Sequence, residues 1–147
     1  MGFLKGKTAI ITGGGRAVLS DGSCGSIGYG IATAYAKEGA NLVITGRNLQ
    51  KLEDAKGELE RLYGIQVLPV QADVNAGTDN EAAVANVVKQ AIDTFGRIDV
   101  LINNAQASAS GVSLADHTTE QFNLALYSGL YAVFYYMKAC YPYLKET

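Results

Sequence analysis

Residues 8–32 read TAIITGGGRAVLSDGSCGSIGYGIA, and this stretch decides the fold. It opens with a short, nearly continuous apolar run at 8–12, which predicts a strand buried on both faces of a sheet. A glycine-rich segment follows, and the apolar spacing after Ser26 predicts a helix. A glycine turn between a strand and a helix allows backbone amides to approach a pyrophosphate at the positive end of that helix. We therefore expect a dinucleotide to bind at this turn.

Three more short apolar runs follow, at residues 41–45, 66–70 and 100–103. Helical patterns lie between them, and the clearest spans about 79–95, after the capping-box sequence TDNE at 78–81. Because strands alternate with helices, the sheet is expected to be parallel, with right-handed crossovers that place helices on both faces. The sequence thus predicts a doubly wound α/β fold of the Rossmann type, with strand order 3-2-1-4.

The chain has the length of one domain, so a single dinucleotide-binding domain is expected over residues 1–147. Its last part carries a second capping box at 118–121 and then a helical segment, 122–144, that is apolar on nearly every face. Six of the nine tyrosines lie in this segment. Two interpretations remain open: a helix buried in the core, or a helix that also faces a partner subunit, since tyrosine is common at interfaces.

Composition and charge exclude several functions. The chain has 12 basic and 14 acidic residues, a net charge of −2, and so offers no basic stripe for nucleic acid. No apolar run reaches the roughly 20 residues that span a bilayer, so no membrane partner is expected. Cys24 and Cys140 lie far apart and no signal sequence opens the chain, which favours a cytoplasmic protein. His117 has no ligand-spaced neighbours, so no metal site is expected.

Three stretches carry a more specific signal: GKTAIITG at 6–13, ADV at 72–74 and FGRIDVLINNA at 95–105. Together they resemble the N-terminal, cofactor-binding part of the short-chain dehydrogenase/reductase family, and the resemblance covers essentially the whole chain. It implies that the glycine turn holds the pyrophosphate of NAD(P)(H) and that Asp73 and Val74 flank the adenine. It also implies that the Asn-Asn-Ala turn supports the central strand near the cofactor.

The sequence departs from the family pattern at three places. About nine extra residues precede Ser26, which stands where the second glycine is expected, so phosphate contacts within 16–24 are not assigned. Gln106 replaces the glycine that follows Asn-Asn-Ala. Gly129 aligns with a helix asparagine that helps a proton relay in the family.

After the second predicted strand the sequence reads TGRN at 45–48, with glycine where NAD-preferring relatives carry an acid. An acid there would bind the ribose 2′-hydroxyl, whereas a guanidinium can pair with a 2′-phosphate. We expect NADP(H) rather than NAD(H), with Arg47 as the phosphate ligand; the alternative is a solvated arginine at a helix start. The expected cofactor-binding residues are Gly13, Ser26, Ile27, Gly28, Arg47, Asp73, Val74, Asn103 and Ala105.

No catalytic residue is predicted within the chain, because the family's catalytic serine and Tyr-x-x-x-Lys are expected beyond Thr147. Residues 141–145 (YPYLK) match Tyr-x-x-x-Lys. By alignment they form the tail of the preceding helix, and Pro142 removes an amide that a continuous helix would need. The Rossmann fold is therefore expected to be incomplete after the fourth strand and the long helix.

Three functions follow from these observations. The leading one is the NADP(H)-binding part of a short-chain oxidoreductase that interconverts a small-molecule carbonyl and alcohol by hydride transfer, as a homo-oligomer. The long glycine loop suggests a relative of the enoyl-thioester reductases, although the Asn-Asn-Ala run speaks against it. The third is a non-catalytic nucleotide-binding or oligomerisation module. Whichever of these functions applies, we expect the chain to self-associate through the edge strand at 100–103 and the tyrosine-rich helix.

Overall fold

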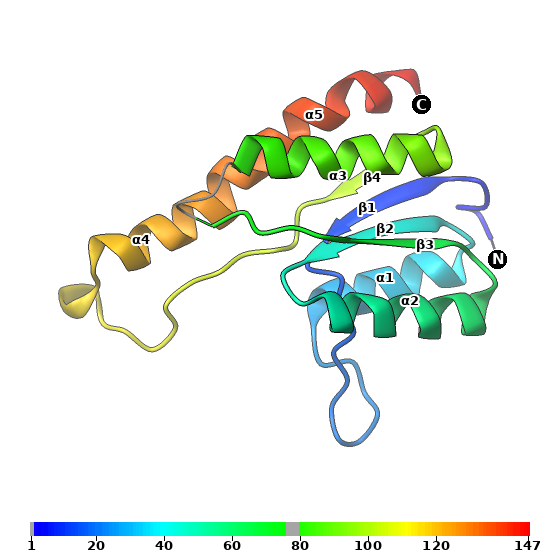
Figure 1. The fold of residues 1–147 in the computed structure, drawn as a ribbon. Coiled ribbons are helices and arrows are strands. Elements are labelled where there is room, and N and C mark those ends of the chain that lie inside the picture. The colour runs from blue at the N-terminus through cyan, green and yellow to red at the C-terminus, as the bar shows by residue number, and fades with distance from the viewer. Residues whose placement is uncertain (1, 76–79) are drawn as a thin grey trace.

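Four strands form one parallel sheet in the order β3-β2-β1-β4, which confirms the predicted topology (Figure 1). The structure is a computed structural model that describes residues 2–75 and 80–147. β1 spans Thr8–Thr12, β2 Asn41–Gly46, β3 Val67–Gln71 and β4 Val100–Ile102. Each boundary lies within one residue of its prediction.

Two pairs of helices cover the two faces of the sheet (Figure 1). Helices α1 (Ile27–Lys37) and α2 (Leu49–Tyr63) pack on one face. Helices α3 (Asn80–Phe95) and α5 (Ala132–Glu146) pack on the other. Side chains alternate along the strands, so that β1 and β2 contribute to both cores and are buried almost completely.

The helix starts follow the capping signals in the sequence. Ser26 caps α1 by accepting a hydrogen bond from the Tyr29 amide, and Asn48 caps α2 by accepting one from the Lys51 amide. The capping box predicted at 78–81 begins outside the described residues. Gly64 ends α2 with a φ of 66°, a left-handed conformation that glycine adopts at little cost. Local chemistry therefore sets most element boundaries.

The segment after β4 differs from the single long helix predicted over 122–144. A short 3₁₀ turn, Leu114–Asp116, is followed by α4 (Thr119–Leu126), which carries the predicted capping box. A π-helical turn, Tyr127–Tyr131, then joins α4 to α5, and the Ala132 amide donates to the Tyr127 carbonyl five residues back. Figure 1 shows α4 projecting beyond the sheet while α5 lies beside α3.

Pro142 lies inside α5, which continues to Glu146. Residues 141–145 therefore form the tail of this helix, as predicted, although the proline offers no amide for the helical hydrogen bonds. Its buried face carries Tyr136 and Cys140, whose pKa values burial raises to about 12 in both cases. The opposite face exposes the large apolar side chains of Phe134, Met137 and Tyr141, and Leu130 in the preceding π turn is exposed as well. One face of α5 is thus buried in the core, and the opposite face is exposed.

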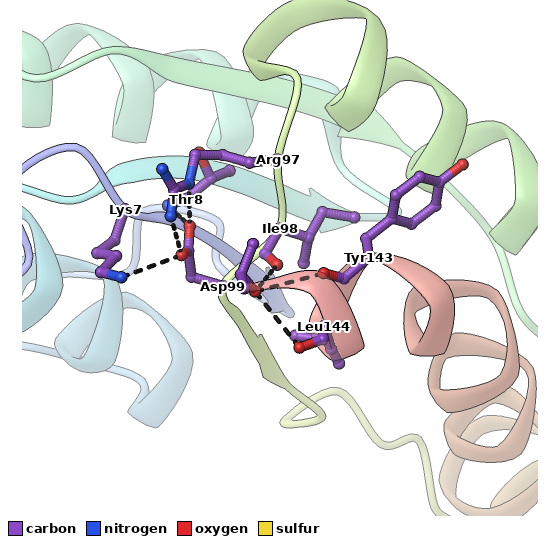
Figure 2. A network of polar contacts seen from close by, with 8 residues as sticks. Lys7, Thr8, Arg97, Ile98, Asp99, Tyr143 and Leu144 are labelled. Carbon is purple, nitrogen blue, oxygen red and sulfur yellow. Dashed lines mark hydrogen bonds and ion pairs between the residues drawn. The ribbon is translucent and has the colours of Figure 1, made fainter.

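A polar network closes the sheet at the amino ends of the strands (Figure 2). The Asp99 carboxylate accepts hydrogen bonds from Arg97 and from the Thr8 amide, at 2.9 Å, and lies 3.4 Å from the Lys7 ammonium. The Asp99 side chain is only 6% exposed, and its hydrogen bonds from Arg97 hold the pKa of the carboxyl below its usual value. The Asp99 carboxylate therefore has a structural role at this edge of the sheet.

Within the described parts of the chain, no helix combines the length and apolar character needed to cross a bilayer.

Candidate cofactor-binding site

An open cleft lies along the carboxyl ends of the strands. One part, of about 750 Å³, is lined by the glycine turn, Ser26 and the start of α2. A second part, of about 290 Å³, is lined by the segments that follow β3 and β4. The two parts share Gly13, Gly46 and Arg47 in their walls. In open parallel sheets ligands bind outside the carboxyl ends of the strands, where the strand order reverses, and here that point lies between β1 and β4.

The glycine turn is packed so closely that side chains could not replace its hydrogens. Gly13 has a φ of 72°, and its amide donates to the Thr45 carbonyl at 2.7 Å. A Cβ on Gly28 would lie 2.0 Å from the Gly13 carbonyl oxygen and 2.6 Å from Asn104 Nδ2. Glycine at these positions lets the first turn of α1 approach the end of β1. Gly28 is therefore placed as a packing residue, beneath the cleft rather than in its wall.

Ser26, the N-cap of α1, lines the larger part of the cleft, so the start of this helix lies at the wall of the cleft. Ile27, which follows it, is 76% exposed. The first amides of a helix have no partner inside the helix, and they carry the positive end of its dipole. This arrangement suits the negative charge of a pyrophosphate. The part of the cleft expected to bind phosphate therefore fits such a group on geometry as well as on sequence.

The end of β4 is held against β1 by a set of short hydrogen bonds. The Thr12 hydroxyl oxygen accepts from the amides of Asn104 and Ala105, each at 2.9 Å. Asn104 Nδ2 donates to the Thr12 carbonyl, also at 2.9 Å. Asn104 thus provides the support of the central strand that the resemblance implied for the Asn-Asn-Ala turn, whereas Asn103 is the asparagine that was expected to bind the cofactor. The repeated asparagine was the available signal, but only the structure shows which of the two faces β1.

Two basic side chains line the larger part of the cleft at the start of α2. Arg47 is exposed there and forms no ion pair with any residue that the structure describes. Its backbone carbonyl accepts a hydrogen bond from Gln71 Nε2 at 2.8 Å, which fixes the segment that carries it. Lys51 lines the same wall one turn into α2 and was not singled out from the sequence. A phosphate in this part of the cleft would meet positive charge from both.

The extra residues of the glycine turn form a hairpin that is tied to both neighbouring helices. Val18 and Cys24 pair across it as an isolated antiparallel bridge. Arg16 Nε donates to Glu58 at 2.8 Å, and the Tyr29 hydroxyl donates to the other oxygen of the same carboxylate. Burial and the bond to Glu58 raise the pKa of Tyr29, whereas that bond lowers the pKa of Glu58. Arg16 is thus bound to α2 through its hydrogen bond to Glu58.

Asp73 and Val74 lie on the far side of the cleft, after β3, and both line its smaller part. Ala105 lines the same part, opposite them. Asn103 and Ala105 also border a cavity of about 30 Å³ beneath. The nine predicted residues are therefore gathered at one edge of the sheet, with Gly28 below the cleft and Ile27 beside it. Within the described residues, no three His, Cys, Asp or Glu side chains are grouped as a metal site would require.

A four-stranded parallel sheet with a glycine turn at its switch point places the chain in the class of Rossmann-type dinucleotide-binding folds. Comparison with known proteins makes the assignment narrower. A family model described as short chain dehydrogenase matches residues 7–147, and the chain belongs to this family of oxidoreductases.

Individual relatives agree with this assignment. A protein of Clostridium sp. (strain ATCC 29733 / VPI C48-50) named 12alpha-hydroxysteroid dehydrogenase is 65% identical over 147 residues, which cover all of this chain and 54% of the relative. An alcohol dehydrogenase from the archaeon Thermococcus sibiricus, complexed with 5-hydroxy-NADP, has a TM-score of 0.82 at 29% identity. That match covers 96% of this chain and 54% of the other.

An NAD+-bound xylitol dehydrogenase is similar in structure as well, with a TM-score of 0.81 and 26% identity. The match covers 97% of this chain and 49% of the other. The chain therefore spans about half the length of these relatives. Structural neighbours bind either form of the nicotinamide cofactor, so the choice between them depends on the residues of the cleft.

Proposed function

We propose that this chain is the NADP(H)-binding part of an oxidoreductase that interconverts an alcohol and a carbonyl compound. The observation that carries the proposal is the cleft at the carboxyl ends of the strands, with a helix N-terminus at its centre and Arg47 at one end. When bound, the cofactor would supply or accept the hydride. The chain's own residues bind it, orient it and hold its phosphates.

The residues of the cleft have distinct tasks in this proposal. The first turn of α1 and the glycine turn hold the pyrophosphate through backbone amides. Asp73 and Val74 border the adenine, and Arg47 pairs with the 2′-phosphate. Gly46, beside Arg47, brings no carboxylate that would repel this phosphate. NADP(H) is therefore proposed over NAD(H), and the cytoplasmic setting favoured by the sequence remains a prediction.

Replacing the arginine tests the choice of cofactor. Arg47→Ala should weaken NADPH binding about 10- to 50-fold, because a charge-assisted pair with the phosphate is lost, and should leave NADH binding unchanged. Both affinities can be measured by fluorescence titration. Arg61→Ala, in the last turn of α2 and so at the far end of this helix from Arg47, serves as the control. An unchanged affinity of a folded Arg47→Ala variant for NADPH would contradict the proposal.

The proposed substrate class is a steroid that carries a hydroxyl or oxo group, because a relative named hydroxysteroid dehydrogenase is 65% identical along the whole chain. The test adds oxo-steroids to the chain with NADPH and follows the loss of absorbance of the reduced cofactor. Binding of NADPH without turnover is expected both of the cofactor-binding part of an oxidoreductase and of a non-catalytic nucleotide-binding module, because no catalytic residue is predicted within the chain. Turnover would show that the chain holds catalytic groups that its sequence did not predict.

Self-association is proposed through the open face of α5 and the π turn. Leu130, Phe134, Met137 and Tyr141 are 57–63% exposed, and burial of such side chains favours association. Phe134→Glu should therefore raise the monomer fraction in light scattering at about 50 µM, a concentration of ordinary association. Glu53→Lys on exposed α2 is the control. If the wild-type chain is monomeric at this concentration, the proposed self-association is wrong.

A further inference from the structure

Gln106 and Gly129, two of the positions where the sequence departs from the family pattern, lie against each other in the structure. A Cβ on Gly129 would lie 3.3 Å from Gln106 Cγ, 3.6 Å from Cδ and 3.5 Å from Nε2. The Gln106 side chain thus lies against the π turn at Gly129. These two residues, 23 positions apart in the sequence, form one local unit that we call the Gln106–Gly129 pair.

The backbone on either side of Gln106 is fixed. The Ala105 amide donates to Thr12 Oγ1 at 2.9 Å, which ties it to β1. The Ala107 amide donates to Ser128 Oγ at 2.9 Å, which ties it to the π turn. Ser128 is 4% exposed, and its hydroxyl lies 2.7 Å from the Leu124 carbonyl, which can accept its proton. Gln106 is therefore held between two anchored neighbours.

Gln106 lines the smaller part of the cleft and is exposed, and its carboxamide forms no hydrogen bond with any residue that the structure describes. A carboxamide offers two donor hydrogens and one acceptor oxygen. The Gln106 side chain rests against Gly129 and has no protein hydrogen-bond partner among the described residues, so it is available to bind a ligand, and this contact reduces the ordering that binding requires. The ligand group that suits it is one that both donates and accepts, such as a ribose diol.

The strand order indicates which half of a dinucleotide would reach this carboxamide. Arg47 and Asp73 follow β2 and β3 and mark the adenosine half. The glycine turn that follows β1 holds the pyrophosphate. Gln106 follows β4, on the other side of β1, where the second nucleoside would lie. We propose that the Gln106–Gly129 pair positions the nicotinamide-side ribose, with the Gln106 carboxamide hydrogen-bonded to its hydroxyls. This inference rests on the proposed function.

Three probes that share the adenosine half test the assignment: NADPH, 2′-phospho-ADP-ribose, which lacks only the nicotinamide, and adenosine 2′,5′-bisphosphate, which lacks the second ribose. Gln106→Ala should raise the Kd of the first two about tenfold, the size of one hydrogen bond, and leave the third unchanged. Equal weakening of all three, or no change in any, would overturn the assignment. If the wild-type chain bound none of them, the proposed function itself would fail.

The glycine gives a second, independent test. Gly129→Ala should shift the Gln106 side chain, because the added Cβ would lie 3.3 Å from its Cγ, and should weaken NADPH binding less than Gln106→Ala does. Alanine is the better helix former, so the fold should be retained. In the Gln106→Ala background the same change should have no further effect, because coupled residues are not additive. Gly57→Ala in α2, where a Cβ meets nothing within 4 Å, is the matched control. Additive losses in the double variant would overturn the pairing.

Discussion

The two ends of the sheet are built in opposite ways. At the amino ends of the strands, the buried Asp99 carboxylate gathers Arg97, Lys7 and the Thr8 amide, so that its charge is matched by side chains of the protein. At the carboxyl ends, glycines and small residues border an open cleft, and Arg47 has no ion-pair partner among the described residues. The stability of the fold and its capacity to bind a ligand are therefore located at opposite ends of the same strands.

The largest expected effect comes from the closely packed end of the cleft. Gly28→Ala would place a Cβ 2.0 Å from the Gly13 carbonyl oxygen, a contact that only a backbone shift can relieve. We expect an NADPH affinity at least about 100-fold lower and a loss of about 2 kcal/mol in the free energy of unfolding. Calorimetric titration and urea unfolding measure the two quantities.

Gly30→Ala, two residues further along α1, is the matched control for this variant. Its Cβ would meet only the Cys24 Sγ, at 3.3 Å, which belongs to the hairpin and can move. Both measured quantities should stay close to wild type. Equal effects of the two substitutions would show that the close approach at Gly28 has no special importance for the cleft.

The second effect should fall on stability alone. Asp99→Ala leaves the buried Thr8 amide without its acceptor and should lower the free energy of unfolding by about 2–3 kcal/mol. The NADPH affinity of the folded variant should not change, because the network lies at the opposite edge from the cleft. A large loss of affinity in a stably folded variant would contradict the separation of stability and ligand binding between the two ends of the strands.

The same carboxylate predicts a dependence on pH. The pKa of Asp99 is lowered from 3.8 in the fold, so its stabilising effect is fully present above that value and is lost as the pH falls through the folded-state pKa. The stability difference between wild type and Asp99→Asn should therefore be constant above about pH 5 and shrink below about pH 4. Urea unfolding at several pH values measures it. A difference independent of pH would contradict an ionised, hydrogen-bonded Asp99.

A smaller effect is expected at the hairpin of the glycine turn. Glu58→Gln weakens the charge-assisted bonds from Arg16 and Tyr29 and should cost about 1 kcal/mol. Cleavage within residues 16–24 by a protease should become faster. Glu53→Gln, an exposed position on the same helix, provides the comparison. Unchanged cleavage would show that Glu58 does not hold the hairpin.

The smallest effect should be a gain. Gly57 lies inside α2, and a Cβ added to it would meet no other atom within 4 Å. Gly57→Ala should raise the free energy of unfolding by about 0.5–1 kcal/mol, because alanine loses less backbone entropy on entering a helix. Thermal unfolding would detect this change. A loss of stability would show that glycine at this position has a role that its surroundings do not reveal.

The element types and strand order were predictable because their causes are local. Buried parallel strands read as short apolar runs, and Asn48 and Thr118 cap helices through contacts three residues away. The hairpin at 16–24 could not be assigned in the same way. Its anchor is Glu58, 42 positions from Arg16 in the sequence, and no local pattern connects the two.

The candidate site shows the same limit. Gly13 and Arg47 were predicted from their places after predicted strands and Asp73 from the family resemblance. The structure places all three in the wall of one cleft, because parallel strands bring their carboxyl ends together. Gln106 and Gly129 were noticed only as departures from a pattern, one at a time. Their contact depends on the path of the chain after β4, which no periodicity in the sequence describes.

The π turn has a consequence for changes in chain length. Ser128, Ala132, Tyr136 and Cys140 are all buried at intervals of four residues, although such intervals drift by about 40° per step around an ideal α-helix. The wider turn at Tyr127–Tyr131 offsets part of that drift. Deleting one residue there would rotate the two halves of the helix by about 100° relative to each other. Ser128 and Tyr136 could then not both face inward, so a single deletion would disturb this helix more than most substitutions.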